Sequence, residues 1–296
     1  MKKVIVIIGP TASGKTKIGV ELAKRLNTEV ISGDSVQVYK KLNIGSAKVT
    51  SKEMEGVKHH LIDILELDED YSVCEFQKQA RLLIDELSIP LIVGGTGLYI
   101  KAALSNYEFD APKRDKAFEL SYKEVSNEEI YKELLKLDPK ACEVIHPNNR
   151  HRALRALYAA KNNQPLSSKN KKDEMLYEAY IIYLDMPRDL LYERINKRVD
   201  MMFEEGLEAE VRNIYRDHTL PHAIGYQEFL PYFNGEISLE EVKEDIKKNS
   251  RHLAKRQITW FKNQMDTHFY EVDLTNIENT INKIYADVLV FLKEVR

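Results

Sequence analysis

Residues 4–16 have the sequence VIVIIGPTASGKT, and this stretch decides the fold. Its β-branched start favours a buried strand. Its second half fits the spacing G-x-x-x-x-G-K-[ST] directly ahead of a helical pattern, where glycines and helix N–H groups surround phosphate. We predict that Lys15 reaches outer phosphate oxygens, that the Thr16 hydroxyl ligates Mg²⁺, and that diphosphate is bound by Gly9, Pro10, Thr11, Ala12, Ser13, Gly14, Lys15 and Thr16.

Outward from this P-loop, strand and helix patterns alternate. Helical periodicity covers 16–26 and 75–87, and a capping box at Ser238 and Glu241 predicts a late helix that runs to about residue 262. Apolar runs that suit parallel strands occupy 29–32, 61–64, 91–93 and 179–184, with 268–272 as a late candidate. The alternation predicts an α/β fold, with a P-loop NTPase-like parallel sheet flanked by helices.

The alternation lapses between 113 and 177, where the patterns are helical. A capping box at Ser126 and Glu129 begins one of these helices, and the polar tract 167–173 is typical of a loop or linker. We therefore predict a helical insertion domain over 113–177 within a catalytic core formed by 1–112 and 178–296.

Composition narrows the class of protein. The 296 residues are 43% hydrophobic, carry a net charge of −3 and contain no apolar run near the ~20 residues of a spanning helix. Cys74 and Cys142 are isolated, which argues against disulfides or zinc and favours buried small side chains. We expect a cytoplasmic protein without membrane contact. The net charge neither suggests nor excludes binding to nucleic acid.

Carboxylates near the strand ends leave two interpretations open. Asp34 follows the second strand and should face the same crevice as Lys15, either as a base or metal ligand or as a turn former. The strand at 91–93 runs into Gly-Gly-Thr-Gly without a carboxylate, which argues against a protein that hydrolyses nucleotides. Asp63 is either a replacement metal ligand or a turn residue.

Seven motifs in order carry a resemblance to tRNA dimethylallyltransferases over residues 4 to about 262. They are GPTASGKT at 9–16, DSVQVY at 34–39, GSAK at 45–48, GGTGLY at 94–99, RALRAL at 152–157, AIGY at 223–226 and AKRQITWF at 254–261. The resemblance implies transfer of a dimethylallyl group from its diphosphate to N6 of adenosine 37 in tRNAs that read U-initial codons. It also implies a Mg²⁺ cofactor, Asp34 as base, Thr96 beside the reacting centre and Arg198 on the diphosphate.

The implied partner is the anticodon stem-loop of tRNA, with no obligate protein partner. A stacked adenine must be flipped into a pocket, and single-stranded loops are bound by stacking and by arginine planes. Basic residues at helical spacing suit this task, although each could also lie on a solvated charged face. The tRNA-contacting residues expected are Asp34, Ser35, Val36, Gln37, Thr96, His151, Arg152, Ala153, Leu154, Arg155, Arg251 and Lys255.

Two other classes of protein remain as alternatives. A small-molecule or nucleotide kinase would use the same P-loop on ATP, with Asp34 as base toward a hydroxyl. A non-catalytic RNA-binding or nucleotide-sensing protein would not need Asp34 for its function. The matching Asp34, Thr96 and Arg198 weigh against this second alternative.

Overall fold

The computed structural model describes residues 1–107, 115–165 and 174–294. These residues form two compact units, here called unit 1 (Met1–Asn106 with Met175–Arg296) and unit 2 (Tyr107–Glu174). The borders predicted from the sequence lie a few residues from these. The predicted linker at 167–173 lies outside the described residues.

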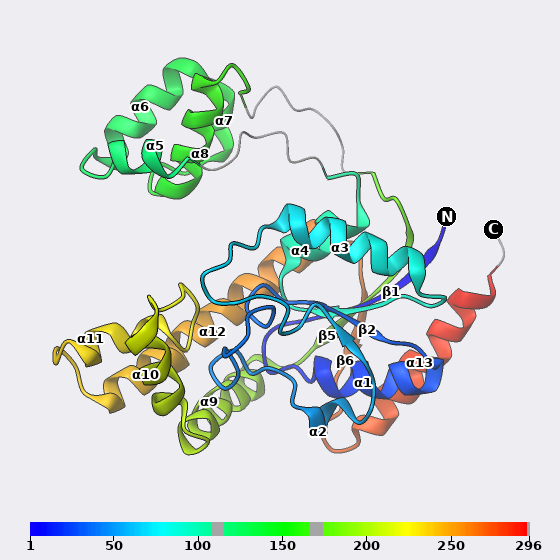
Figure 1. Ribbon diagram of the computed structural model, residues 1–296. Coiled ribbons are helices and arrows are strands. Elements are labelled where there is room, and N and C mark those ends of the chain that lie inside the picture. Colours follow the sequence, from blue (N-terminus) through cyan, green and yellow to red (C-terminus); the bar gives the residue numbers. More distant parts are fainter. Residues whose placement is uncertain (108–114, 166–173, 295–296) are drawn as a thin grey trace. The chain divides into compact units, whose positions relative to one another are not determined.

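Unit 1 is built on one parallel sheet, which confirms the predicted α/β class (Figure 1). Among the described residues the strand order is β3-β2-β4-β1-β5-β6, so β1 is central. The strands are β1 (Lys3–Ile8), β2 (Val30–Gly33), β3 (His59–His60), β4 (Leu91–Gly94), β5 (Glu178–Asp185) and β6 (His268–Glu271).

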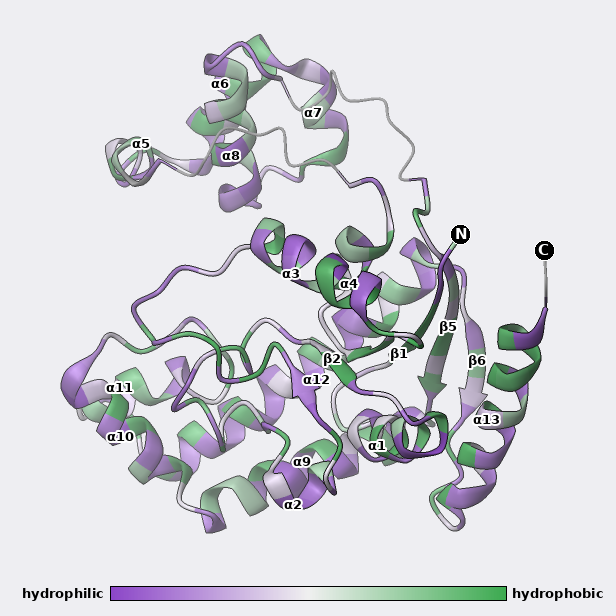
Figure 2. Ribbon diagram, turned by 45° about the vertical axis from the view of Figure 1, so that its right-hand side comes forward, coloured by the Kyte–Doolittle hydropathy of each residue, from purple (hydrophilic) through white to green (hydrophobic). Residues whose placement is uncertain are grey.

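Helices cover both faces of this sheet. Alternate side chains of a strand point to opposite faces, and accordingly Ile5 and Ile7 pack with α1 and α13, whereas Val4, Val6 and Ile8 pack with α3 and α4. In Figure 2 the apolar strands β1 and β5 lie between these helices. The helices of these layers are α1 (Lys15–Leu26), α3 (Val73–Glu86), α4 (Gly97–Leu104) and α13 (Ile277–Lys293), with a one-turn α2 (Ser51–Met54) beside α1.

The remaining helices of unit 1 form a smaller cluster, here called the helical lobe. Its core contains Met202, Val211, Tyr226, Phe229 and Ile246, all buried. The elements involved are α9 (Arg188–Glu204), α10 (Leu207–Asp217), the 3₁₀ turn η2 (Gln227–Phe229), α11 (Leu230–Phe233) and the start of α12 (Leu239–Gln264). The capping box predicted at Ser238 and Glu241 begins α12, which extends from the lobe to the sheet.

Unit 2 is helical, as predicted. Ser126 and Glu129 form the expected capping box, and Asp138 caps the next helix, in which Pro139 occupies the first turn. Ile130, Leu134 and Leu157 are at the centre of its apolar core. Its helices are α5 (Lys116–Ser121), α6 (Asn127–Leu137), α7 (Pro139–Val144) and α8 (Arg150–Lys161).

Two expectations were wrong. Residues 61–64 form turns rather than a strand, because Leu61 and Asp63 have φ angles of 61° and 54°, and only His59–His60 pairs with β2. Cys74 and Cys142 are partly exposed rather than buried. No helix in the described part of the chain combines the length and apolarity needed to cross a bilayer.

The strands β2 and β4 approach each other closely at their carboxyl ends. Gly33 and Gly94 are paired in register, and a Cβ added to Gly94 would overlap the carbonyl group of Gly33. At Gly95 an added Cβ would instead meet the end of the Gln257 side chain, at 2.7 Å. A side chain can rotate away, whereas paired backbone cannot.

We therefore expect Gly94→Ala to lower the free energy of unfolding by about 1–3 kcal/mol, the usual cost of overpacking. Gly95→Ala is the matched control and should cost clearly less, because only the Gln257 amide must move. Urea denaturation of both variants measures the difference. Equal stability of the two variants would contradict the close approach of β2 and β4.

Candidate functional site

The P-loop lies between β1 and α1 and has the predicted backbone. Ala12 and Gly14 have φ angles of 64° and 93°, which turn the chain into the helix. Gly9 leaves no room for a side chain, because an added Cβ would stand 3.0 Å from the Leu184 carbonyl oxygen on β5. Free N–H groups at the start of α1 therefore point toward the space above the carboxyl end of β1.

Two hydroxyl groups of the loop are available to a ligand. The Ser13 hydroxyl is completely buried and has no hydrogen-bond partner among the residues that the structure describes. A buried polar atom without a partner is costly unless a ligand or water satisfies it. Thr16 is exposed, and it also lines a small cavity with Ser32 and Gln37.

Three cationic side chains converge on this loop. Lys15 Nζ donates to the carbonyl groups of Gly9 (3.0 Å) and Pro10 (2.7 Å), so the lysine currently caps its own loop. One turn apart on α9, Arg194 Nε donates to the Ala12 carbonyl group at 3.0 Å, and Arg198 donates to the Thr11 hydroxyl. The predicted place of Arg198 at the P-loop agrees with this geometry.

The electrostatics of these cations favour a bound anion. Burial, and then the Arg198 charge, lower the pKa of Lys15 to about 7, whereas Asp34 acts in the opposite direction. Burial, and then Arg194, lower the pKa of Arg198 to about 10, with Asp34 again opposing. A polyphosphate at the loop would relieve the repulsion between these positive charges.

Asp34 follows β2 and makes the contacts of the turn former that was one of its two interpretations. Its Oδ1 atom accepts hydrogen bonds from the backbone N–H groups of Val36 (2.8 Å) and Gln37 (3.2 Å), which is an Asx turn. Among the described residues no hydrogen-bond partner contacts Oδ2. One oxygen of the carboxylate thus holds the loop, and the other remains available as a proton acceptor.

Thr96 lies beside Asp34 because β2 and β4 are neighbours. Its backbone N–H donates to the Gly33 carbonyl group at 3.2 Å, and its Oγ1 accepts from the Ser35 N–H at 3.2 Å. The predicted trio of Asp34, Thr96 and Arg198 therefore comes from the adjoining ends of β2 and β4 and from α9.

Gln257 on α12 joins the P-loop to this pair, although the sequence analysis gave it no role. Its Oε1 accepts from the Thr11 N–H at 2.8 Å, and its Nε2 donates to the Gly95 carbonyl group at 3.0 Å. Trp260, one turn further along, packs directly on Gly97. Gln257 lies within the motif AKRQITWF at 254–261, and its place in that motif was the sequence feature that could have indicated a role for it.

Helix α12 presents a cationic groove lined by His252, Lys255, Arg256, Thr259, Trp260, Asn263 and Gln264. Lys255 is exposed there as expected for contact with tRNA. Arg251 points elsewhere, because it donates to Asn196 Oδ1 on α9 at 2.6 Å. The structure therefore gives Arg251 a role between helices rather than at this groove.

In unit 2 the predicted tRNA residues divide between two sides of α8. His151, Arg152 and Arg155 are exposed. Ala153 and Leu154 are buried in the helical core, since they lie on the opposite side of the same helix. The side chains of these two residues hold α8 in place and are not available to tRNA.

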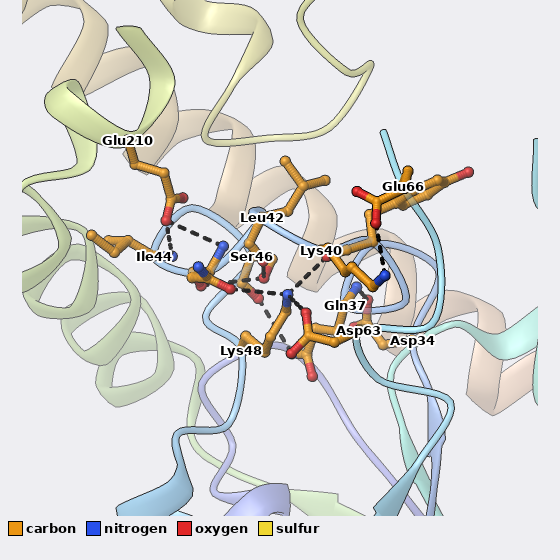
Figure 3. A network of polar contacts seen from close by, with 12 residues as sticks. Asp34, Gln37, Lys40, Leu42, Ile44, Ser46, Lys48, Asp63, Glu66 and Glu210 are labelled. Atoms are coloured by element: carbon orange, nitrogen blue, oxygen red, sulfur yellow. Dashed lines mark hydrogen bonds and ion pairs between the residues drawn. The ribbon is translucent and has the colours of Figure 1, made fainter. Parts of the chain in front are cut away.

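The loop that follows Asp34 is held by a polar network (Figure 3). The Lys48 ammonium is buried and donates to the Tyr39 carbonyl group (2.8 Å), to Asn43 Oδ1 (3.0 Å) and to Asp63. This contact and the positive φ of Asp63 favour the turn interpretation of that residue. Within the described residues no group of three or more His, Cys, Asp or Glu side chains could hold a metal.

Known proteins resemble this chain over most of its length. A family model described as IPP transferase matches residues 37–264. A tRNA dimethylallyltransferase from Anoxybacillus flavithermus is 46% identical and aligns with 96% of this chain and 95% of its own length. One from Macrococcus caseolyticus is also 46% identical, with the same coverage.

Solved structures give the same result. The crystal structure of a tRNA isopentenylpyrophosphate transferase from Staphylococcus epidermidis superposes with a TM-score of 0.73 at 42% identity, covering 97% of this chain and 99% of that one. A eukaryotic dimethylallyltransferase acting on tRNA gives 0.84 at 27% identity, covering 100% and 81%. The chain therefore belongs to the tRNA dimethylallyltransferase family.

Proposed function

We propose that this protein transfers a dimethylallyl group from dimethylallyl diphosphate to N6 of adenosine 37 in tRNAs that read U-initial codons, and releases diphosphate. Family membership supports prenyl transfer to tRNA. The chemistry is carried by one observation. A carboxylate with one free oxygen, on Asp34, lies within electrostatic range of the two cations at the P-loop, Lys15 and Arg198.

The reaction makes one bond and breaks one. The lone pair of adenine N6 forms a bond to the allylic carbon, and the bond from that carbon to the diphosphate oxygen breaks with its electrons going to the diphosphate. The N6 proton goes to Asp34. Because N6 is a weak nucleophile, a base within reach of its proton assists the attack. Thr96, which accepts a hydrogen bond from the Ser35 N–H in the loop of Asp34, would lie beside the reacting adenine.

The leaving diphosphate gains negative charge as the bond breaks. Groups already oriented toward that charge stabilise the transition state more than the ground state. Arg198, the Ser13 hydroxyl and the N–H groups at the start of α1 lie at the P-loop and would be such groups. Lys15 must leave the carbonyl groups of its own loop to reach the phosphate.

The residues present fit a Mg²⁺ ion that is bound together with the diphosphate. Mg²⁺ keeps several waters and takes few protein ligands when phosphate oxygens are available. The exposed Thr16 hydroxyl is the ligand we assign, and the absence of a carboxylate cluster in the described residues agrees with a site of this kind. The ion would supply further neutralisation of the leaving group.

For tRNA we propose contacts from both units. In unit 1 these are Asp34–Gln37, Thr96 and Lys255, and in unit 2 the exposed His151, Arg152 and Arg155. Val36 packs on the apolar core of the helical lobe, and Gln37 Nε2 is occupied by the carbonyl groups of Ser46 and Ala47. These two residues would therefore contact tRNA mainly through their remaining exposed atoms.

The alternative of a kinase shares the P-loop but would transfer the γ-phosphate of ATP. Mass spectrometry of unmodified tRNA incubated with protein and Mg²⁺, with dimethylallyl diphosphate in one tube and ATP in the other, separates the two. One dimethylallyl group on the adenosine beside the anticodon, only in the first tube, supports prenyl transfer. No product with several tRNAs that read U-initial codons would overturn the proposal and favour the kinase.

Asp34→Asn should lower the turnover number by about 10²–10⁴-fold, the usual share of a general base. The amide oxygen can keep the Asx turn, whereas the amide cannot accept the N6 proton. Single-turnover kinetics measure the step, and filter binding of tRNA should be nearly unchanged. Turnover within a few-fold of the wild type would remove Asp34 from proton transfer.

Binding of tRNA should weaken steeply as salt rises, because Lys and Arg release counterions from phosphates. The double variant of Arg152→Ala and Arg155→Ala should reduce the slope of log affinity against log salt by about 1 for each arginine that binds a phosphate in the wild type. Lys132→Ala, on α6 of the same unit, serves as control because Lys132 is paired with Glu128 at 2.8 Å. An unchanged slope in the double variant would exclude this face of α8 as a tRNA-binding surface.

A further inference from the structure

One carboxylate of the helical lobe holds the loop that follows Asp34 (Figure 3). The backbone N–H groups of Asn43 (3.2 Å), Ile44 (2.9 Å) and Gly45 (3.1 Å) all donate to Glu210 on α10. The hydroxyl group of Tyr226 donates to the same carboxylate at 2.9 Å. Glu210 thus accepts four hydrogen bonds, three of them from consecutive residues of a loop that is distant in sequence.

Tight packing accompanies these bonds. A Cβ on Gly45 would stand 2.6 Å from the ring of Tyr226, so only glycine permits this contact. Tyr226 is completely buried, and burial, with Glu210 next, raises the pKa of its hydroxyl group, which therefore stays a donor. Gly225, with φ of 94°, lies against the backbone of Gly45. The loop and the lobe therefore meet with little freedom to slide.

The four hydrogen bonds that Glu210 accepts, here called the clamp, are connected to Asp34 by further hydrogen bonds. Gln37 Nε2 donates to the carbonyl groups of Ser46 (3.3 Å) and Ala47 (3.2 Å), directly after the clamped residues. The backbone N–H of Gln37 donates to Asp34 Oδ1 at 3.2 Å. Movement at residues 43–45 would thus reach the turn that orients the Asp34 carboxylate.

We propose that Glu210 is a positioning residue, which sets the orientation of Asp34 toward the acceptor by holding residues 43–45. The proposal rests on the function proposed above. An ionised carboxylate is an acceptor only, and it suits a site where every partner is a donor. A glutamine at this position would turn one amide NH₂ group toward those donors, and the clamp would have fewer hydrogen bonds although the side chain keeps its shape.

Glu208 provides a matched control on the same helix. Its carboxylate pairs with Arg212 at 2.6 Å and accepts from the Tyr232 hydroxyl at 3.1 Å. These contacts lie within the helical lobe and do not touch residues 43–45. Replacement of Glu208 tests the effect of a weakened lobe alone.

The test compares Glu210→Gln and Glu210→Ala with Glu208→Gln in steady-state kinetics with tRNA and dimethylallyl diphosphate. We expect the Glu210 variants to lower kcat by about 10–100-fold, as for removal of supporting hydrogen bonds or a small misplacement of reacting groups. The KM for dimethylallyl diphosphate should stay within about twofold, because the P-loop does not touch this clamp. Glu208→Gln should keep the kcat of the wild type.

Equal kcat values for the Glu208 and Glu210 variants would overturn the positioning role. So would Glu210 variants in which the KM values for tRNA and for dimethylallyl diphosphate rise equally while kcat does not fall. Hydrogen exchange of the amides at Asn43, Ile44 and Gly45 supplies a readout that is independent of the reaction. Exchange should accelerate in Glu210→Gln and not in Glu208→Gln. If the wild type forms no prenylated tRNA, the proposed function fails, and unaltered exchange in Glu210→Gln would separately overturn the clamp.

Discussion

The close backbone contact between Gly33 and Gly94 determines where the candidate site can form. Strands β2 and β4 pair up to their last residues, so the loops that carry Asp34 and Thr96 leave the sheet side by side. Since β4 also pairs with β1, these loops emerge next to the P-loop. A side chain at Gly94 would push the loops of Asp34 and Thr96 apart, because it would meet the Gly33 backbone, and one at Gly33 would press on the packed Ile100.

Charge is the second constraint on this edge of the sheet. Lys15, Arg194 and Arg198 gather around the P-loop, and the Asp34 carboxylate opposes the charges of Lys15 and Arg198, with a further contribution from Glu53 at Arg198. Burial, and then the charge of a neighbouring arginine, lowers the pKa values of Lys15 and Arg198, so Asp34 offsets only part of the cost of holding these charges. A site with this electrostatic character is better suited to a strongly anionic leaving group than to a neutral ligand.

The sequence was sufficient for the parts of the structure that depend on local patterns. The strand at β1, the P-loop and the capping boxes at Ser126 and Ser238 follow from residue spacing, and all of them were predicted. The strand expected at 61–64 was wrong, because Leu61 and Asp63 have positive φ angles and Asp63 turns toward Lys48. The roles of Gln257 and Glu210 depend on contacts with residues more than 160 positions away, which no local pattern contains.

The P-loop and the loop of Asp34 are therefore held by different parts of unit 1. The P-loop is fixed by β1, α9 and Gln257, whereas the loop of Asp34 is fixed by Lys48 and by Glu210 of the helical lobe. In the proposed reaction Lys15 would change its hydrogen bonds when diphosphate enters and leaves, and a separate support would keep that change from moving Asp34. A carboxylate that both accepts a proton and shapes a turn needs such a support. Protonation of one oxygen removes the negative charge, and the hydrogen bonds that the other oxygen accepts in the turn become weaker.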